Sequence, residues 1–335
     1  MIEETTNKLS RTLYVSDLDG TLLNEDSVLS GDTIAMLNRI IEELGGLFTV
    51  ATARTPATVV PLMQQVHANL PFIVIGGSAM WNPVTCDYEH TRCIDDETVN
   101  AVSDVFDRHG LHPFIYRRHG SLLYTHHCGS LSVQEERFVA ARQHLPLKRF
   151  FLDDQHYRHN ADEALLIFAM NKYAVLKALA TDLQAVSTCT VMLYHDIFDE
   201  SEGYLEIFTA GTSKAGAIRD LARQVGADRV VVFGDNRNDI AMLQAADHSV
   251  AVENAFSEVK AAASEVIGPN TADSVPRWIL HELEARSEER GVRSEELTSL
   301  YTHTPIFAPP SPLLAGVARH KNLPNSRELP NFASH

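Results

Sequence analysis

The chain has 335 residues, of which 44% are apolar and 21% are charged. This length and composition predict a globular protein with two modules of ordinary domain size. The formal net charge of −16 argues against a nucleic-acid surface, which needs clustered Lys and Arg, and means that a phosphate ester needs local cations in order to bind.

The sequence also indicates where the protein works. Its four cysteines lie far apart and form no Cys-x-x-Cys pair, which fits a reducing compartment. No run reaches the ~18 apolar residues of a membrane span, and residues 1–9 lack a cationic segment followed by an apolar stretch. We expect a soluble cytoplasmic protein, a monomer or weak homodimer, without nucleic-acid or membrane partners.

The N-terminal part of the chain alternates between strand and helix patterns. Short apolar runs rich in β-forming residues predict strands over 12–16, 47–51 and 72–75. Helical segments separate these strands: Ser30 is expected to cap the first helix, and Pro56 stands in the first turn of the second. This β-α-β-α-β order indicates an open parallel sheet.

The same alternation returns toward the other end of the chain. Strands are predicted over 204–208, 229–233 and 249–252, and helices over 213–225, 239–246 and 255–263. We therefore assign residues 1–83 and 202–284 to one α/β core.

Residues 84–201 have a different pattern, which we interpret as a second, α+β domain inserted into the core. Its strands are predicted over 113–116, 122–126, 165–170 and 189–194, and its helices around 95–108, 134–144 and 173–183. Residues 285–335 carry mixed charges and then scattered prolines with little periodicity, so this tail is predicted to be irregular or disordered.

Two carboxylates follow the first predicted strand. Asp17 and Asp19 belong to an Asp-Leu-Asp-Gly-Thr run, and on an extended chain their side chains would share a face. Two such carboxylates stay ionised together if a divalent cation balances their charge. By itself, this run also fits an ordinary turn with solvated aspartates.

A second acidic loop follows the strand predicted over 229–233. Asp235 and Asp239 would lie at the carboxyl end of a parallel strand, where ligands of such sheets bind. Asp235 would complete an all-oxygen site with Asp17 and the backbone carbonyl of Asp19. Oxygen ligands, few carboxylates and a phosphate indicate Mg²⁺, while Asp239 also suits a helix N-terminus.

Two further residues suit the binding of an anion. Thr52 stands where the second strand gives way to a helix, so its hydroxyl and nearby N–H groups form an anion site; a simple helix cap is the interpretation for Thr55. Lys214 begins a helix, where a cation opposes the helix dipole. That placement indicates a function, although most surface lysines are merely solvated. Beside Asp17 and a phosphate, Lys214 would supply the local cation.

Four segments together resemble the motifs of the haloacid dehalogenase superfamily. In chain order they are 14–23, 51–54, Lys214 and 234–239. The resemblance covers residues 11–283, and the insert between the second and third motifs is similar to that of the Cof-type subfamily with a C2B cap. It implies a Rossmann-like three-layer sandwich with a parallel sheet, plus an inserted α+β C2B cap that sets substrate specificity.

The resemblance also implies a role for each motif residue. Asp17 would attack phosphorus and become an aspartyl phosphate, and Asp19 would act as acid and then as base. The residues implied for Mg²⁺ are Asp17, the Asp19 carbonyl, Asp235 and, in support, Asp239. The residues implied for the phosphoryl oxygens are Thr52, Ala53, Lys214 and Asn238.

We therefore expect a Mg²⁺-dependent phosphatase that hydrolyses small-molecule monoesters such as sugar phosphates or cofactor phosphates. A mutase or phosphotransferase with the same chemistry stays open. A receiver-like signalling domain phosphorylated on Asp17 is disfavoured, because receivers are single domains without such an insert. Asp19, as a proton donor to the leaving group, also favours turnover.

The sequence departs from the superfamily pattern in two places. Ala53 replaces the usual glycine of the second motif, which keeps the N–H group but adds a methyl. Residues 76–79 read Gly-Gly-Ser-Ala where Asn-Gly-Ala is usual, so an amide side chain is missing. Within the cap, the candidates to face the substrate are two groups of residues, Arg117, Arg118 and His119, and Tyr194, His195 and Asp196.

Overall fold

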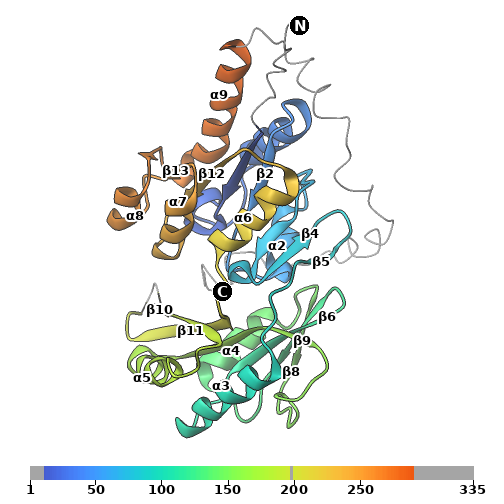
Figure 1. The fold of residues 1–335 in the computed structure, drawn as a ribbon, viewed down its shortest axis with the longest axis vertical. Helices are drawn as coiled ribbons and strands as arrows, with labels where there is room; N and C mark the ends of the chain where they lie inside the picture. The colour runs from blue at the N-terminus through green and yellow to red at the C-terminus, as the bar shows by residue number, and fades with distance from the viewer. Residues whose placement is uncertain (1–10, 197–198, 290–335) are drawn as a thin grey trace, which may run out of the picture.

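A computed structural model of the protein describes residues 11–196 and 199–289. Within these residues the chain forms two units, one above the other in Figure 1, and it passes twice between them. The upper unit contains both ends of the described chain, and the lower unit is built from a continuous stretch between them.

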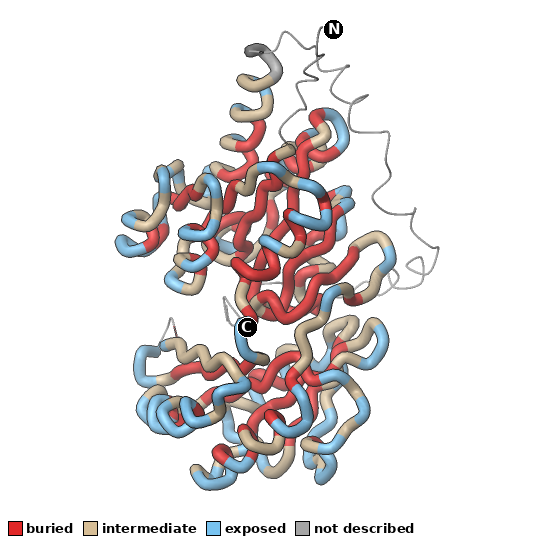
Figure 2. The backbone as a smooth tube through the Cα atoms, viewed as in Figure 1, coloured by how far each residue is buried: buried red, intermediate tan, exposed pale blue. Residues whose placement is uncertain are grey.

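The upper unit is built on a five-stranded sheet with the order β14-β13-β12-β1-β2. All of its strand pairs are parallel, and β1 and β2 are buried along their whole length, as Figure 2 shows. Such burial is expected for a parallel sheet covered on both faces. The strands are β1 (Thr12–Ser16), β2 (Leu47–Val50), β12 (Arg229–Gly234), β13 (His248–Ala251) and β14 (Glu265–Val266).

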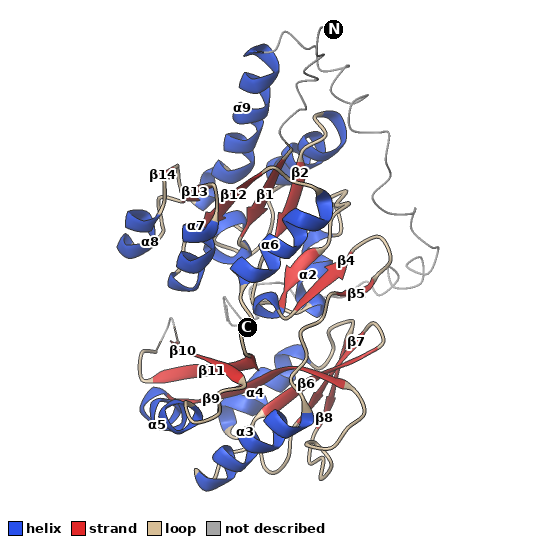
Figure 3. Cartoon of the chain, viewed as in Figure 1, coloured by secondary structure: helices blue, strands red, loops and turns tan. Residues whose placement is uncertain are grey.

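Helices cover both faces of this sheet, which makes the three-layer α/β sandwich that the sequence predicted. α6 packs beside α7, and α1 packs against α9; α6 and α7 lie in front of the strands in Figure 3. The helices of this unit are α1 (Gly31–Asn38), α2 (Pro56–Met63), α6 (Lys214–Val225), α7 (Ile240–Ala245), α8 (Ser257–Ala262) and α9 (Ser274–Glu289).

Capping chemistry explains several of these boundaries. The Ser30 hydroxyl accepts a hydrogen bond from the Thr33 N–H at 2.9 Å and starts α1. The Ser213 hydroxyl does the same for α6 by accepting from the Gly216 N–H at 3.1 Å. Gly226 ends α6 in the left-handed region, with φ +64°. The start of α6 is therefore fixed at Lys214.

A small three-stranded sheet leads the chain out of the upper unit. β3 (Phe72–Val74) touches the end of β2 through one parallel bridge, Ala51 to Ile73. It otherwise pairs antiparallel with β4 (Ala79–Asn82), which pairs with β5 (Asp87–Glu89). The sequence predicted β3 but neither β4 nor β5.

The lower unit is the predicted α+β insert. Its six-stranded sheet has the order β10-β11-β9-β6-β7-β8, and all pairs are antiparallel except β7 with β8. The strands are β6 (Phe114–His119), β7 (Leu122–His126), β8 (Lys148–Phe151), β9 (Glu163–Lys172), β10 (Cys189–His195) and β11 (Glu202–Thr209). Its helices are α3 (Asp96–Arg108), α4 (Val133–Arg142) and α5 (Tyr173–Leu183).

The structure corrects one strand assignment. The strand predicted over 204–208 exists as β11, but it lies between β10 and β9 in the antiparallel sheet and not in the parallel sheet. Six consecutive residues of β11 are buried, because both faces of this sheet are covered. A strand buried on both faces has the same apolar pattern in either kind of sheet, so the sequence alone did not distinguish them.

The predicted tail needs a smaller correction. Residues 285–289 continue α9 as helix, and Arg286 donates to the Thr12 hydroxyl at 2.8 Å, which ties the helix to β1. The rest of that prediction, residues 290–335, lies outside the described residues. No helix in the described part of the chain is long and apolar enough to cross a membrane.

Candidate active site

The site begins at the carboxyl end of β1, which lies between β12 and β2 in the parallel sheet. Asp17 is the next residue, and its N–H donates to the Phe233 carbonyl of β12 at 3.0 Å. β1 and β12 are in parallel register, with Ser16 opposite Phe233. The loops that follow the two strands therefore emerge side by side, and Asp17 and Asp235 meet although they are far apart in sequence.

Lys214 links the carboxylates of these two loops. Its Nζ lies 2.6 Å from Asp17 Oδ1 and 2.8 Å from Asp239 Oδ1, and its side chain is only 7% exposed. Burial by itself lowers the pKa of an ammonium group, but the two carboxylates outweigh burial and raise the pKa of Lys214. Lys214 is therefore a fixed positive charge beside Asp17, as the sequence predicted.

Three carboxylates form a cluster that fits a metal ion. Asp17, Asp235 and Asp239 each place an oxygen within 4.8 Å of the others. Burial raises the pKa of Asp17 well above its ordinary value; Lys214 opposes this shift, while Asp239 and Asp235 add to it. Burial and the neighbouring Asp239 raise the pKa of Asp235 to about 7. Lys214 alone does not balance these three carboxylates, of which Asp17 and Asp239 are buried, and a divalent cation would.

The oxygens that remain available also suit a hard cation. Asp235 Oδ1 accepts from the Thr21 hydroxyl at 2.7 Å, and Asp239 Oδ2 accepts from the N–H groups of Asp235 and Asn236 at 3.2 and 3.1 Å. Within the described residues, the second oxygens of Asp17 and Asp235 accept no hydrogen bond. The donor set is oxygen only, which suits Mg²⁺. Both oxygens of Asp239 already accept hydrogen bonds, one from Lys214 and the other from the loop N–H groups. Asp239 would therefore support the metal site beside Asp17 and Asp235.

Asp19 is placed differently from the other aspartates. Its carboxylate is not a member of the cluster formed by the described residues. Instead, Arg54 Nε donates to Asp19 Oδ2 at 2.7 Å, and Arg54 Nη2 donates to Asp19 Oδ1. Arg54 belongs to the second motif but had been given no role from the sequence. The signal that could have found it is a cation two residues after Thr52, at the same edge of the sheet.

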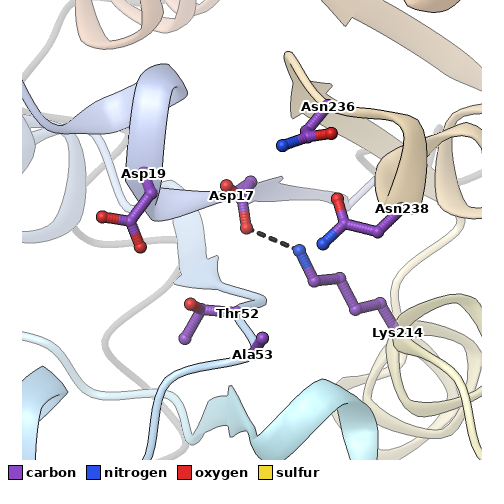
Figure 4. A pocket seen from close by; sticks show the side chains of 7 residues that line it. All are labelled: Asp17, Asp19, Thr52, Ala53, Lys214, Asn236 and Asn238. Atoms are coloured by element: carbon purple, nitrogen blue, oxygen red, sulfur yellow. Dashed lines mark hydrogen bonds and ion pairs between the residues drawn. The ribbon is translucent and has the colours of Figure 1, made fainter. Parts of the chain in front are cut away.

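Seven residues line a pocket over Asp17, and Figure 4 shows them with Asp17 pointing toward Lys214. The Thr52 hydroxyl accepts from the Arg54 N–H at 3.1 Å, so its own proton is available for a ligand. The Asn238 side-chain oxygen is buried and has no hydrogen-bond partner among the residues that the structure describes. The lining residues are Asp17, Asp19, Thr52, Ala53, Lys214, Asn236 and Asn238.

The pocket thus brings together all the residues that the sequence proposed for phosphate, namely Thr52, Ala53, Lys214 and Asn238. It adds Asn236, which the sequence did not single out although it lies in the same acidic loop. Ala53 lines the pocket with its methyl and is 8% exposed. The small size of its side chain keeps the backbone at this point close to the space over Asp17.

Two glycines allow the loops of the site to approach one another. Gly20 has φ +74°, and a Cβ at this position would lie 2.3 Å from Asp235 Oδ2. Gly77 has φ +97°, and a Cβ there would lie 2.4 Å from the Ser213 carbonyl oxygen, directly before Lys214. Both positions therefore need glycine, for backbone conformation and for space.

The residues of the cap that the sequence proposed to face the substrate divide into two groups. Arg117 is fully buried and donates to backbone carbonyls, including Asp162 O at 2.8 Å and Arg158 O at 2.9 Å. Arg118 pairs with Glu163, and His119 stacks on Tyr124. These three residues hold the cap together and do not line the pocket.

The second group, at the end of β10, has different surroundings. Burial, and then the charge of Glu206, raises the pKa of Tyr194, while the charge of Lys214 lowers it. His195 instead stacks on Tyr173, and Asp196 accepts a hydrogen bond from the Tyr204 hydroxyl. None of the six candidates lines the pocket over Asp17 within the described residues, and Tyr194 is the one whose pKa responds to the charge of Lys214.

The chain resembles known proteins over most of its length. A family model for haloacid dehalogenase-like hydrolases matches residues 14–279. The chain is 28% identical over 280 residues to the pyridoxal phosphate phosphatase YbhA of Escherichia coli, covering 80% of this chain and 97% of the relative. It is 22% identical over 275 residues to the 5-amino-6-(5-phospho-D-ribitylamino)uracil phosphatase YitU of Bacillus subtilis, covering 80% and 96%.

Solved structures share the same fold. A haloacid dehalogenase-like hydrolase from Bacteroides thetaiotaomicron aligns with a TM-score of 0.65 at 22% identity, covering 81% of this chain and 99% of that one. The haloacid dehalogenase subclass IIB sugar phosphatase BT4131 aligns with a TM-score of 0.63 at 20% identity, covering 81% and 98%. At these identities the likeness establishes the fold, a core with an inserted cap.

The fold and site define a class of protein with an α/β core, an inserted cap, and a buried aspartate paired with a lysine at the carboxyl edge of the parallel sheet. The match over residues 14–279 shows that the chain belongs to the haloacid dehalogenase-like hydrolase family, as its four motifs predicted. Both relatives named above are phosphatases, and the family to which the chain belongs is one of hydrolases.

Proposed function

We propose that the protein is a Mg²⁺-dependent phosphatase of small-molecule phosphate monoesters that works through an aspartyl phosphate on Asp17. The observation that carries this proposal is the position of Asp17. Its buried carboxylate lies 2.6 Å from Lys214 Nζ and within 4.8 Å of the carboxylates of Asp235 and Asp239. A carboxylate fixed between an ammonium and a cation site is oriented for attack and kept ionised.

The proposed first step is transfer of the phosphoryl group to Asp17. An Asp17 oxygen forms a bond to phosphorus while the bond to the leaving alkoxide breaks in line. Asp19 donates a proton to that alkoxide and later takes a proton from the water that hydrolyses the aspartyl phosphate. Arg54 holds the Asp19 carboxylate through two nitrogens, which fixes its orientation for both transfers.

The remaining pocket residues would bind the phosphoryl oxygens. Lys214 supplies charge, and the Thr52 hydroxyl and the Asn238 side chain supply hydrogen bonds toward the space over Asp17. Mg²⁺ bound by Asp17, Asp235 and the Asp19 carbonyl, with Asp239 in support, would neutralise charge that develops on the same oxygens. Lys214 and Mg²⁺ would be the local cations that a chain of net charge −16 needs in order to bind a phosphate.

The proposed substrates are sugar phosphates or cofactor phosphates. The relatives named as phosphatases of pyridoxal phosphate and of a ribitylaminouracil phosphate support this class. We place specificity in the cap, residues 84–201 in the predicted division, with the core in 1–83 and 202–284. The position of β11 in the cap sheet favours a boundary after Thr209. Cytoplasmic location, and a monomer or weak homodimer, stay predictions.

A phosphomutase or phosphotransferase would use the same Asp17 chemistry and differ in the acceptor. A screen of phosphate monoesters with and without Mg²⁺ tests the proposal, with Asp17→Asn as the control. We expect turnover that requires Mg²⁺ and falls by about 10³-fold or more in Asp17→Asn. Equal turnover by the two proteins would exclude Asp17 as nucleophile, and a strict need for a bisphosphate activator would favour a mutase.

A further inference from the structure

The two faces of the cap sheet are covered by different parts of the protein. Ile115 of β6 and Ile167 of β9 pack with α3 and α5, and these helices lie on the side away from the upper unit in Figure 1. Side chains alternate between the faces of a strand, so Tyr116 and Phe168 point to the other side. There they join the cluster that contains Phe138 of α4 and continues into the core.

Packing places this second face toward the core. Phe208, at the end of β11, lies against the core loop, because a Cβ added at Gly76 would be 3.0 Å from its ring. Phe138 and Val139 of α4 belong to the same buried cluster as the strands of the core. Electrostatics agree with this placement, since the charge of Arg54 contributes to the lowered pKa of Arg142 at the end of α4. The α4 side of the cap therefore faces the core.

Two cations lie on this face among aromatic rings. The Arg142 guanidinium lies 4.3 Å from the centre of the Phe138 ring. Lys148 Nζ of β8 lies 4.2 Å from the centre of the Tyr116 ring, 4.8 Å from that of Phe150 and 5.3 Å from that of Phe138. The two charges thus share the Phe138 ring, on a protein whose net charge is strongly negative.

Lys148 is not explained by packing alone. It is 2% exposed, so its ammonium does not reach water in the way that the ends of most buried lysine stems do. Within the described residues it makes no ion pair with a carboxylate. Burial, and then the charge of Arg142, lowers its pKa well below the ordinary value. The charged form of a lysine in such surroundings would be stabilised most by an anion that binds beside it as part of a ligand.

We propose that Arg142, with Lys148 behind it, binds an oxyanion on the leaving group of the substrate: a carboxylate, a phenolate or a second phosphate. The inference rests on the proposed phosphatase function and adds to it the chemistry of the group that is released. Arg142 is the contact residue, because it is less deeply buried than Lys148 and its planar fork suits an oxyanion. Lys148 lies behind it against the Phe138 ring, where an anion bound by Arg142 would favour the charged form of Lys148.

Matched pairs of esters test this inference. Each pair differs by one acidic group: glycerol 3-phosphate and 3-phosphoglycerate, glucitol 6-phosphate and 6-phosphogluconate, phenyl phosphate and 3-carboxyphenyl phosphate. We expect the wild-type protein to prefer the acidic member of at least one pair by about 10- to 100-fold in kcat/KM, the effect of one charge-assisted hydrogen bond. Arg142→Gln should reduce that preference to near unity.

Three further variants separate binding from folding. Arg142→Lys keeps the charge without the fork and should retain part of the preference. Lys148→Met fills a similar volume without charge and should reduce the preference by a smaller factor. Arg137→Gln, on the exposed side of the same helix, is the matched control and should leave it unchanged. Thermal melting of every variant establishes that it is folded.

The outcomes distinguish the two proposals. If the wild-type protein hydrolyses both members of every pair equally well, or if its preference is the same in Arg142→Gln, this inference is overturned and the phosphatase function stands. If it hydrolyses no member of any pair with Mg²⁺ present, the proposed function is overturned and the inference with it. A preference that disappears in Arg142→Gln but persists in Arg137→Gln supports the inference.

Discussion

Arg54 Nε lies 2.7 Å from Asp19 Oδ2, and Arg54 Nη2 donates to the other oxygen of the same carboxylate. The arginine side chain is 13% exposed and that of the aspartate 8%, so solvent screens this pair little. A bidentate pair of this kind restricts a carboxylate to one plane and one direction. It connects the second motif to the acid–base residue that the first motif provides.

Replacing Arg54 should impair proton transfer more than phosphoryl binding. We expect Arg54→Gln to reduce kcat by about 10²-fold for an alkyl phosphate, whose leaving group needs a proton from Asp19. The loss should be below about 10-fold for p-nitrophenyl phosphate, whose leaving group is a weak base. Arg54→Lys, which keeps the charge but not the fork, should resemble Arg54→Gln. Steady-state kinetics with both esters measure this, and equal losses for the two would contradict it.

Removing one carboxylate of the cluster should have opposite effects on metal affinity and on stability. In Asp235→Asn the Mg²⁺ concentration for half-maximal activity should rise by about 10- to 100-fold, because a charged ligand is lost. In EDTA, however, the variant should be more stable than the wild type at pH 8, by on the order of 1–3 kcal/mol. The activity titration and melting curves in EDTA measure the two effects.

The sign follows from the pKa of Asp235, which burial and then Asp239 raise to about 7. An aspartate in the unfolded chain has a pKa near 3.9, so the Asp235 carboxyl group keeps its proton over a wider pH range in the folded state. The wild-type protein in EDTA should therefore lose stability as the pH rises from about 4 to about 7. Mg²⁺ should restore stability, because it binds the folded state alone. A pH-independent difference between the two proteins would contradict this account.

Gly77→Ala should disturb the start of α6 and with it Lys214. The new Cβ would lie 2.4 Å from the Ser213 carbonyl oxygen, on a backbone with φ +97°. We expect a loss of at least ~2 kcal/mol in the free energy of unfolding and a loss of kcat. Gly110→Ala is the control: φ is +65° there, but nothing lies within 4 Å of the added Cβ. It should cost ~1 kcal/mol and leave kcat unchanged; similar losses of kcat would argue against the steric explanation.

His127 should make the stability of the cap depend on pH. Burial, and then the charge of His112, lowers the pKa of His127 to about 4, against about 6.5 in an unfolded chain. The folded state therefore favours the neutral ring. The contribution of His127 to the free energy of unfolding is complete above pH 6.5. It should be lost as the pH falls from about 6.5 to about 4, by about 2 kcal/mol.

Urea unfolding at a series of pH values measures this effect, with His127→Phe as the comparison. The phenyl ring would keep the contact with Phe114, whose ring centre lies 4.6 Å from that of His127. The variant should lack this part of the pH dependence. If its stability falls with pH as steeply as that of the wild type, the dependence comes from other groups.

Much of the parallel sheet could be predicted from the sequence because its signals are local. The apolar runs that became β1, β2, β12 and β13 are short and end in polar loops, and Ser30, Ser213 and Gly226 mark helix ends through their own side chains or backbone conformation. The order of the loops also placed Asp17, Thr52 and Asp235 at one edge of the sheet. That geometry follows from parallel strands, without knowledge of any contact.

What the sequence could not decide are the partners of residues that lie far apart. Arg117 looked like a candidate for substrate binding, and the folded cap instead buries it against the carbonyls of residues 157–162. β11 carries the pattern of a strand buried on both faces, and only the pairing of whole strands assigned it to the cap. The contact of Arg54 with Asp19 spans 35 positions, and no spacing rule relates the two.

Asp17 illustrates which features the sequence determines and which depend on the tertiary structure. The sequence by itself determined that this residue ends a buried strand beside a second aspartate, because strand propensity and turn chemistry act over a few residues. Only the tertiary structure decided that Lys214, 197 positions away, lies 2.6 Å from it, and that Asp19 turns to Arg54 and not to the cluster. Such choices depend on how the strands pack and which charges must be balanced once water is excluded, and those are properties of the folded chain.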